Sequence, residues 1–207
     1  ICREIKQRKL KISWSFRTRV DLVNANMLDE LKEAGCIRIY YGIESGDPII
    51  LKNINKKINI EAVKKAINLT KEKGIDTFGY FMIGNIGETE RTIKRTSDLM
   101  LELPLDYVQI SPVCAPPNTA LYELLKKKIN RDYWQDYTLN LTKQDLLPLY
   151  GTDLTHKEIK RYVRKCYFKF YLRFNYIIKT LFKLSYSKFI RSIKALKDMI
   201  FYYCLDE

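Results

Sequence analysis

Four short apolar runs alternate with amphipathic segments along the first half of the chain. The runs are Lys11–Arg17, Cys36–Ile43, Ile75–Gly84 and Asp106–Val113. They are apolar almost throughout, which is typical of strands buried on both faces of a parallel sheet. The segments between them carry apolar residues at helical spacing. Strands that alternate with helices in this way predict βαβ units and a parallel sheet.

The expected helices have recognisable start and stop residues. Asn24 or Asn26 is a suitable N-cap for the helix after the first run, and Gly35 is its expected end. Pro48 stands at a first-turn position of a short helix, and Gly74 ends the helix after that. The local signals therefore agree with the alternation of strands and helices.

The predicted fold class is α/β: an incomplete parallel (β/α) barrel, similar to half of a TIM barrel, followed by an α-helical C-terminal extension. Four units make half of an eight-stranded barrel or two thirds of a six-stranded one, so the sheet does not close. An open parallel sheet exposes unpaired strand edges. Because the chain also begins with Ile1, we expect it to be an excerpt or a truncated reading frame that lacks an N-terminal half-barrel.

The pattern changes after about residue 130. We expect three parts: the barrel segment 1–129, a linker-like segment 130–154 with weak helical turns, and a helical extension 155–207. Thr155 and Glu158 form a capping box at the start of this extension. Its first helix places one apolar face opposite a basic one, and a last helix is expected from about Lys188.

Most of the basic excess lies in the extension. The net charge of the whole chain is +13, and residues 155–207 contain 13 Lys and Arg against 4 Asp and Glu. Such a segment could bind nucleic acid through its phosphates or lie on an anionic membrane surface. We favour a third interpretation, in which the aromatic face packs on the barrel and the cations face water. No apolar run is long enough to predict a transmembrane helix.

The cysteines do not form a recognisable metal or disulfide pattern. The five are scattered at Cys2, Cys36, Cys114, Cys166 and Cys204. An odd, dispersed set predicts a reducing, cytoplasmic location, and we expect no metal site within this chain. With one histidine, His156, a His-rich metal site is excluded.

Polar or glycine residues follow each apolar run. They include Arg19 after the first run, Glu44 and Ser45 after the second, and Gly84 and Glu88 after the third. In parallel barrels the active site lies at the C-terminal ends of the strands. This mixture of charges, hydroxyls and glycines suits a polar, zwitterionic ligand. The alternative is that the glycines make turns and the glutamates cap helices.

Two segments at a characteristic separation carry a resemblance to a known family. These are "GCIRIYYGIESG" and "FMIGNIGET", with "APPNTALYE" following them. Together they resemble the radical S-adenosylmethionine superfamily, in the branch that often has an N-terminal cobalamin-binding domain. The resemblance implies a partial barrel that holds S-adenosylmethionine beside a 4Fe-4S cluster. Cleavage of the sulfonium then yields a 5′-deoxyadenosyl radical, which acts here on an unknown substrate.

The resemblance also implies roles for six residues. Glu44 and Ser45 would contact the ribose or the methionyl amino group, and Lys56 would lie near the methionyl carboxylate. Gly84 and Glu88 would line the adenosine side, and Arg19 lies in the "RVD" element of the same rim. Lys56 as a solvated helix-end charge, and Arg19 as an ion-pair partner of Asp21, remain alternatives. The resemblance leaves the catalytic residues unknown.

The sequence departs from the family pattern in one important respect. The CxxxCxxC motif that binds the cluster is absent from this chain, so the ligands of the cluster are expected outside it. Three functions stay open. The chain is the C-terminal part of a radical enzyme that uses S-adenosylmethionine and a cobalamin held by a further domain, or a non-catalytic remnant or subunit that needs a partner half-barrel, or a basic nucleic-acid or membrane-binding protein.

Overall fold

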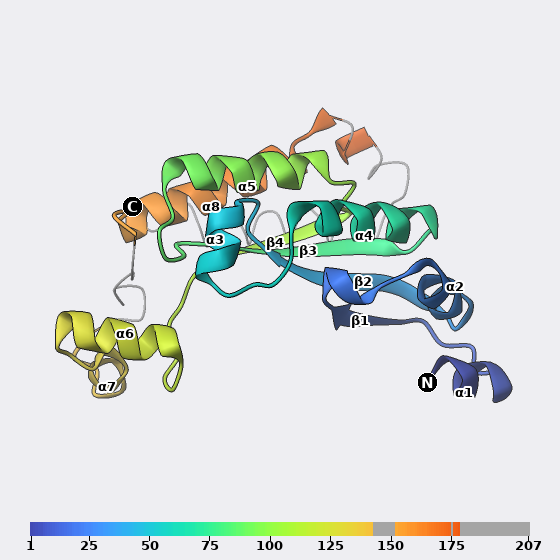
Figure 1. The fold of residues 1–207 in the computed structure, drawn as a ribbon, viewed down its shortest axis with the longest axis horizontal. Coiled ribbons are helices and arrows are strands. Elements are labelled where there is room, and N and C mark those ends of the chain that lie inside the picture. The colour runs from blue at the N-terminus through green and yellow to red at the C-terminus, as the bar shows by residue number, and fades with distance from the viewer. Residues whose placement is uncertain (143–151, 175, 179–207) are drawn as a thin grey trace.

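The computed structural model describes residues 1–142, 152–174 and 176–178. Its centre is one sheet of four parallel strands in the order β1-β2-β3-β4 (Figure 1). The strands are β1 (Trp14–Thr18), β2 (Cys36–Glu44), β3 (Asp76–Ile83) and β4 (Tyr107–Pro112). The predicted α/β class and the parallel order of the sheet are confirmed.

Helices connect consecutive strands, as the alternating pattern predicts. The connections contain the short 3-10 helix η1 (Val20–Leu22), α2 (Ala25–Glu33), α3 (Pro48–Asn53), α4 (Ile60–Glu72) and α5 (Glu90–Glu102). Helix α1 (Cys2–Gln7) precedes β1, and α6 (Ala120–Ile129), α7 (Tyr133–Thr138) and α8 (His156–Tyr171) follow β4. Asn24, not Asn26, caps α2 by accepting a hydrogen bond from the main-chain N–H of Met27. Gly35 and Gly74 follow the ends of α2 and α4 with φ of 87° and 65°, a conformation that glycine adopts without strain.

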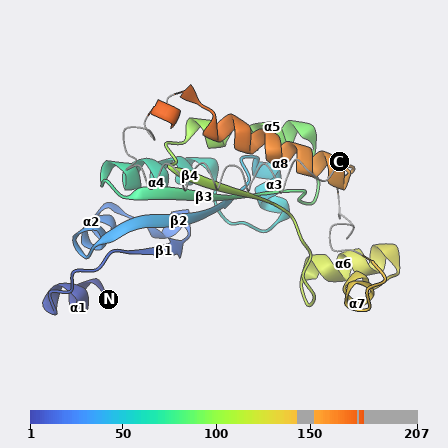
Figure 2. The same ribbon diagram turned by 180° about the vertical axis from the view of Figure 1, so that it is seen from behind.

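The two faces of the sheet differ sharply. One alternate set of strand residues is buried against the helices, as in Ile39, Tyr41 and Ile43 of β2. Figures 1 and 2 show α4, α5 and α8 lying over this same face. We call the opposite face, which carries Tyr40, Gly42 and the other alternate residues, the inner face. No helix with described residues packs on the middle of it (Figure 2).

Helix α8 closes the outer edge of β4. Two tyrosines of α8 replace the missing neighbouring strand. The Tyr167 hydroxyl accepts a hydrogen bond from the N–H of Ile110 (2.9 Å) and donates one to its carbonyl (3.2 Å). The Tyr171 hydroxyl does the same for Val108, at 3.1 and 3.0 Å. The sheet therefore ends at β4, whereas β1 pairs only with β2 among the described residues.

The packing expected for the basic extension is observed in α8. Its predicted apolar face is buried against the sheet and α5, and comprises Ile159, Tyr162, Val163, Cys166, Tyr167 and Phe170. The capping box of Thr155 and Glu158 is present. The helix expected from about Lys188 and Cys204 lie outside the described residues. In the part of the chain that is described, no helix has the length and apolar content to cross a bilayer.

Candidate functional site

Strand β2 ends in an unusual backbone conformation at Glu44. Glu44 is the last residue of the strand and has φ of 69°, in the left-handed region that residues with a side chain rarely adopt. The register with β3 also shifts between Gly42 and Glu44. Strain of this kind persists only where the surroundings enforce it, and it is concentrated at functional sites. The end of β2 is therefore the first place to look for a site.

Lys56 reaches Glu44 because of how α3 ends. Asn55 has φ of 54°, and the N–H of Lys56 donates to the carbonyl of Leu51 while the N–H of Asn55 donates to that of Lys52. This is a Schellman motif, and it turns the chain back across the end of β2. The Lys56 Nζ lies 2.9 Å from Glu44 Oε1, and the two side chains are only 20% and 17% exposed.

The ion pair occupies the space that a side chain at residue 42 would fill. A Cβ atom at Gly42 would lie 2.6 Å from Glu44 Oε1 and 3.0 Å from Lys56 Nζ. Both distances are shorter than a carbon atom allows beside these groups. The absence of a side chain at Gly42 thus permits a carboxylate and an ammonium group to sit directly over the inner face.

Arg19, which follows β1, lies next to this pair but has its own partner. Its guanidinium donates to both carboxylate oxygens of Asp21, at 2.9 and 2.8 Å, and more weakly to the carbonyl of Lys57 at 3.4 Å. The Arg19 hydrogen bond lowers the pKa of Asp21 below its usual value. The structure thus contains the Arg19–Asp21 ion pair that the sequence left open, and among the described contacts Arg19 touches the segment of Lys56 only through the carbonyl of Lys57.

Ser45 points the other way, into the helix layer. Its side chain is fully buried, and its hydroxyl lies 3.0 Å from the hydroxyl of Thr96 on α5. The same Thr96 hydroxyl accepts from the N–H of Gly46 at 2.9 Å, and Ser45 accepts from the N–H of Asp47 at 3.1 Å. These bonds fix the turn that directly follows Glu44.

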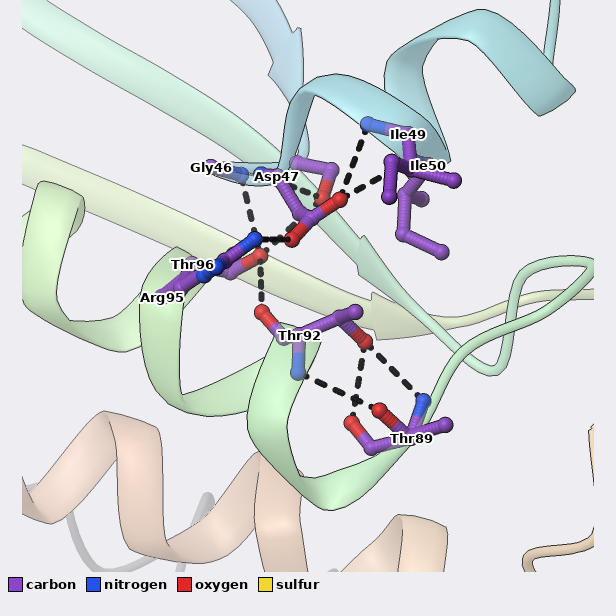
Figure 3. Close-up of polar contacts among 9 residues, drawn as sticks. Gly46, Asp47, Ile49, Ile50, Thr89, Thr92, Arg95 and Thr96 are labelled. Atoms are coloured by element: carbon purple, nitrogen blue, oxygen red, sulfur yellow. Dashed lines mark hydrogen bonds and ion pairs between the residues drawn. The ribbon is translucent and has the colours of Figure 1, made fainter.

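Asp47 completes this turn as the N-cap of α3. Its carboxylate accepts from the N–H groups of Ile49 and Ile50 and from Arg95 at 2.7 Å (Figure 3). Burial opposes ionisation of Asp47, but the hydrogen bonds from Arg95 and from these N–H groups outweigh it and keep the pKa below the usual value. The sequence identified Asp47 as the start of a helix. It gave no signal that Arg95 and Thr96 would meet this turn from about 50 residues away.

Gly84 and Glu88 form a separate group in the loop that follows β3. Glu88 is buried, and its Oε2 accepts from the N–H groups of Gly84 (2.6 Å) and Asn85 (2.9 Å). Its Oε1 is buried without a hydrogen-bond partner. Burial raises the pKa of Glu88, although the two N–H groups partly oppose this effect. Glu88 therefore holds its own loop together, while Thr89 caps α5.

The described residues do not offer ligands for an iron-sulfur cluster. No three His, Cys, Asp or Glu side chains in this part of the chain gather as a metal site would require. Its four cysteines are separate: Cys36 and Cys166 are buried, Cys2 is partly buried, and Cys114 is exposed. The charged pair at Gly42, by contrast, fits a zwitterionic ligand, since it presents one group of each sign.

Comparisons with known proteins bear on the family of the chain. Residues 1–100 match the model of the Radical SAM superfamily. The chain is 33% identical over 181 residues to an uncharacterized methyltransferase of Pyrococcus horikoshii, covering 86% of this chain and 38% of the relative. It is 30% identical over 130 residues to the anaerobic magnesium-protoporphyrin IX monomethyl ester cyclase of Rubrivivax gelatinosus, covering 62% and 23%. The chain thus spans well under half the length of these relatives.

A solved structure supports the fold. The radical S-adenosylmethionine methyltransferase TsrM of Kitasatospora setae, determined with cobalamin and a 4Fe-4S cluster bound, superposes with a TM-score of 0.54 at 19% identity. The superposition covers 60% of this chain and 27% of TsrM. The strand order, the family match and this superposition confirm both the partial barrel and the resemblance seen in the sequence. Residues 1–100 therefore belong to the radical SAM superfamily, whose members use S-adenosylmethionine and a 4Fe-4S cluster.

Proposed function

We propose that this chain forms one side of an S-adenosylmethionine site, in which Glu44 and Lys56 bind the methionyl end of the ligand. The observation that carries the proposal is their half-buried ion pair above Gly42, at the C-terminal end of β2. A zwitterionic amino acid can insert between these groups, with its ammonium on the carboxylate and its carboxylate on the ammonium. Each charge then exchanges one charge-assisted bond for another.

The other four predicted residues take supporting roles in this proposal. Arg19 keeps Asp21 and the main chain of Lys57 in place beside the pair. Ser45 is a positioning residue, because its hydroxyl is used by Thr96 and holds the turn after Glu44. Gly84 and Glu88 shape the loop after β3, so that its backbone lines the adenosine side.

We further propose that the parts missing from this site come from outside the chain. The cluster supplies the electron that cleaves the sulfonium, and its ligands are expected in a segment that pairs with β1, since α8 already covers β4. Cobalamin, where the whole protein uses it, is expected in a further domain. The relatives named above are a methyltransferase and a cyclase, so we infer a radical-based modification of an organic substrate.

The test is a calorimetric titration of S-adenosylmethionine into the anaerobically purified, cluster-loaded protein. We expect saturable binding, and a loss of about tenfold or more in affinity for Glu44→Ala, from one lost charge-assisted bond and the unpaired Lys56 that remains. Absence of binding to the loaded protein would refute the proposal. Unchanged affinity in Glu44→Ala would remove Glu44 from the site.

A second candidate function rests on the exposed side of α8. Lys157, Arg161, Lys165 and Lys169 are all exposed and spaced four residues apart, so they form one basic row. Such a row could bind nucleic acid, with an affinity that falls steeply as salt rises. A filter-binding titration with RNA at two salt concentrations tests it. Affinity that is equal in wild type and in a variant with all four residues changed to Gln excludes this role for the row.

A further inference from the structure

Aromatic side chains form a continuous row on the inner face of the sheet. The ring centroids of Tyr40 and Phe78 are 4.9 Å apart, those of Phe78 and Tyr80 5.1 Å, and those of Phe78 and Tyr107 6.1 Å. Tyr40 and Tyr80 are 6.0 Å apart and nearly parallel. We call these four residues the aromatic row. They come from β2, β3 and β4, so the row crosses three of the four strands of the sheet.

The register of the strands explains why these rings meet. Tyr40 pairs with Phe78, and Phe78 pairs with Tyr107, which places the three side by side on one face. Tyr80 is two residues beyond Phe78 and so projects from the same face. Gly42 pairs with Tyr80. The row therefore leads along the inner face to the Glu44–Lys56 pair, which sits over Gly42.

Two guanidinium groups lie against this row. The Cζ atom of Arg38 is 4.1 Å from the ring centroid of Tyr107, and that of Arg17 is 5.4 Å from the ring centroid of Tyr80. Arg38 also contacts Asp76 at 3.3 Å, which offsets its charge. Its Nε is buried without a hydrogen-bond partner. Arg17 is exposed, and no acidic group within the described residues pairs with it.

This combination is more specific than an ordinary buried surface. The helix-facing side of the same strands is closed off by helices, and its aliphatic residues Ile39, Ile43 and Ile83 and its rings Tyr41 and Phe81 are at most 1% exposed. The inner face instead offers ring surfaces for stacking and an uncompensated cation at one side. Stacked rings favour flat conjugated partners, and a guanidinium favours carboxylates.

We propose that the aromatic row binds the substrate, and that the substrate is a planar, conjugated molecule carrying a carboxylate. Its ring system lies on Tyr80 and Phe78, and its carboxylate accepts hydrogen bonds from Arg17. This inference rests on the proposed function, because the row reaches the end of the sheet where S-adenosylmethionine is proposed to bind. A ligand on Tyr80 would lie beside Gly42, over which the Glu44–Lys56 pair sits.

The experiment measures binding of pyrene-1-carboxylate to the cluster-loaded protein by fluorescence titration. Pyrene-1-methanol, which is flat but uncharged, and cyclohexanecarboxylate, which is charged but not flat, are the comparison ligands. The variants are Tyr80→Leu, Arg17→Gln and, as a matched control, Arg91→Gln. Arg91 is exposed on α5, which lies on the helix side of the sheet. Each protein is also titrated with S-adenosylmethionine.

We expect pyrene-1-carboxylate to bind more tightly than either comparison ligand. Tyr80→Leu should weaken it by roughly threefold to tenfold, and Arg17→Gln by about tenfold. Arg17→Gln should leave pyrene-1-methanol unchanged, and Arg91→Gln should affect neither ligand. The affinity for S-adenosylmethionine should be the same in all three variants.

Two results would overturn the inference. One is that pyrene-1-carboxylate does not bind. The other is that Tyr80→Leu and Arg17→Gln bind it as wild type does, even if Tyr80→Leu lowers the melting temperature, because the row then only packs the interior. If wild type binds the probe but not S-adenosylmethionine, the proposed function fails and this inference loses its basis. If it binds S-adenosylmethionine but not the probe, this inference alone fails.

Discussion

The ammonium nitrogen of Lys56 lies 2.9 Å from a carboxylate oxygen of Glu44, although twelve positions separate the two residues in the chain. Helix α3 and its Schellman motif bring them together, and Gly42 leaves the space that they occupy. The pair joins the strained end of β2 to the residue that follows the Schellman motif of α3. Five predictions follow from these and the other contacts described above.

Lys56→Met should weaken S-adenosylmethionine binding by about tenfold or more, because the ligand's carboxylate loses its cation and Glu44 is left unpaired. The matched control is Lys57→Met. Lys57 is the neighbouring cation, but it is exposed and only its carbonyl takes part in the contacts described. Isothermal titration of both variants makes the comparison. Equal losses in the two would mean that general positive charge, and not this ion pair, sets the affinity.

Gly42→Ala and Gly79→Ala should separate function from stability. A Cβ at Gly42 meets the flexible ends of Glu44 and Lys56, so the pair shifts and ligand affinity falls while the fold is kept. A Cβ at Gly79 would lie 3.0 Å from Leu105 and Phe81 in the packed core. Overpacking of this kind costs about 1–3 kcal/mol. Urea unfolding and ligand titration of both variants give the two readouts, and a reversal of the two effects would contradict the assignment.

Thr96→Val should destabilise the protein by about 1–3 kcal/mol, because the N–H of Gly46 loses its partner and the buried Ser45 hydroxyl loses one of its two. Thr138→Val is the control. Its hydroxyl bonds to the carbonyl of Trp134 on the exposed surface, so a change of less than about 0.5 kcal/mol is expected. Denaturant midpoints measure both. Similar small losses in the two variants would show that the Ser45 turn does not depend on Thr96.

Glu88→Gln should change how stability depends on pH. Burial raises the pKa of Glu88 above its ordinary value of 4.5. Between the ordinary pKa, which holds in the unfolded state, and the raised pKa of the folded state, the folded protein keeps a proton that the unfolded chain has released. The free energy of unfolding therefore falls as pH rises through this window. Glutamine has no such proton, so the variant should become more stable relative to wild type as pH rises above about 4.5.

The control for this pH dependence is Glu90→Gln at an exposed position of the first turn of α5. Unfolding free energies of the three proteins at several pH values between 4 and 8 provide the measurement. A stability difference between Glu88→Gln and wild type that stays constant over this range would contradict the raised pKa. The depressed pKa of Asp47 affects stability only at lower pH. The stabilisation from ionised Asp47 is complete above its ordinary pKa of 3.8 and is lost as pH falls below that value.

Tyr167→Phe should destabilise the protein by about 1–3 kcal/mol, since both the N–H and the carbonyl of Ile110 lose their partner while remaining buried. It should also promote self-association, because an uncovered strand edge can pair with another chain. Tyr162→Phe is the matched control, being a buried tyrosine of the same helix with no hydrogen bond to β4 among those observed. Unfolding curves and sedimentation measure the two effects. A monomeric, equally stable Tyr167→Phe protein would show that β4 does not need this cover.

The sequence by itself determined the order of strands and helices, most helix ends and the superfamily. These features depend on local physics: apolar periodicity, capping residues such as Asn24 and Thr155, and glycines such as Gly74 that adopt a positive φ. It also predicted Glu44 and Lys56 as ligand-binding residues, because they lie close together in one segment of the chain, and the structure adds that they form an ion pair.

Only the tertiary structure decided which predicted residues face the open side of the sheet and which hold the fold together. Ser45 turns toward Thr96 on α5, which bonds to its buried hydroxyl. Glu88 turns into its own loop, where the N–H groups of Gly84 and Asn85 bind one of its two carboxylate oxygens. The hydrogen bonds by which Tyr167 covers the edge of β4 join it to Ile110, 57 positions away in the chain. No local pattern encodes such pairs, since they arise from how helices and strands stack in three dimensions.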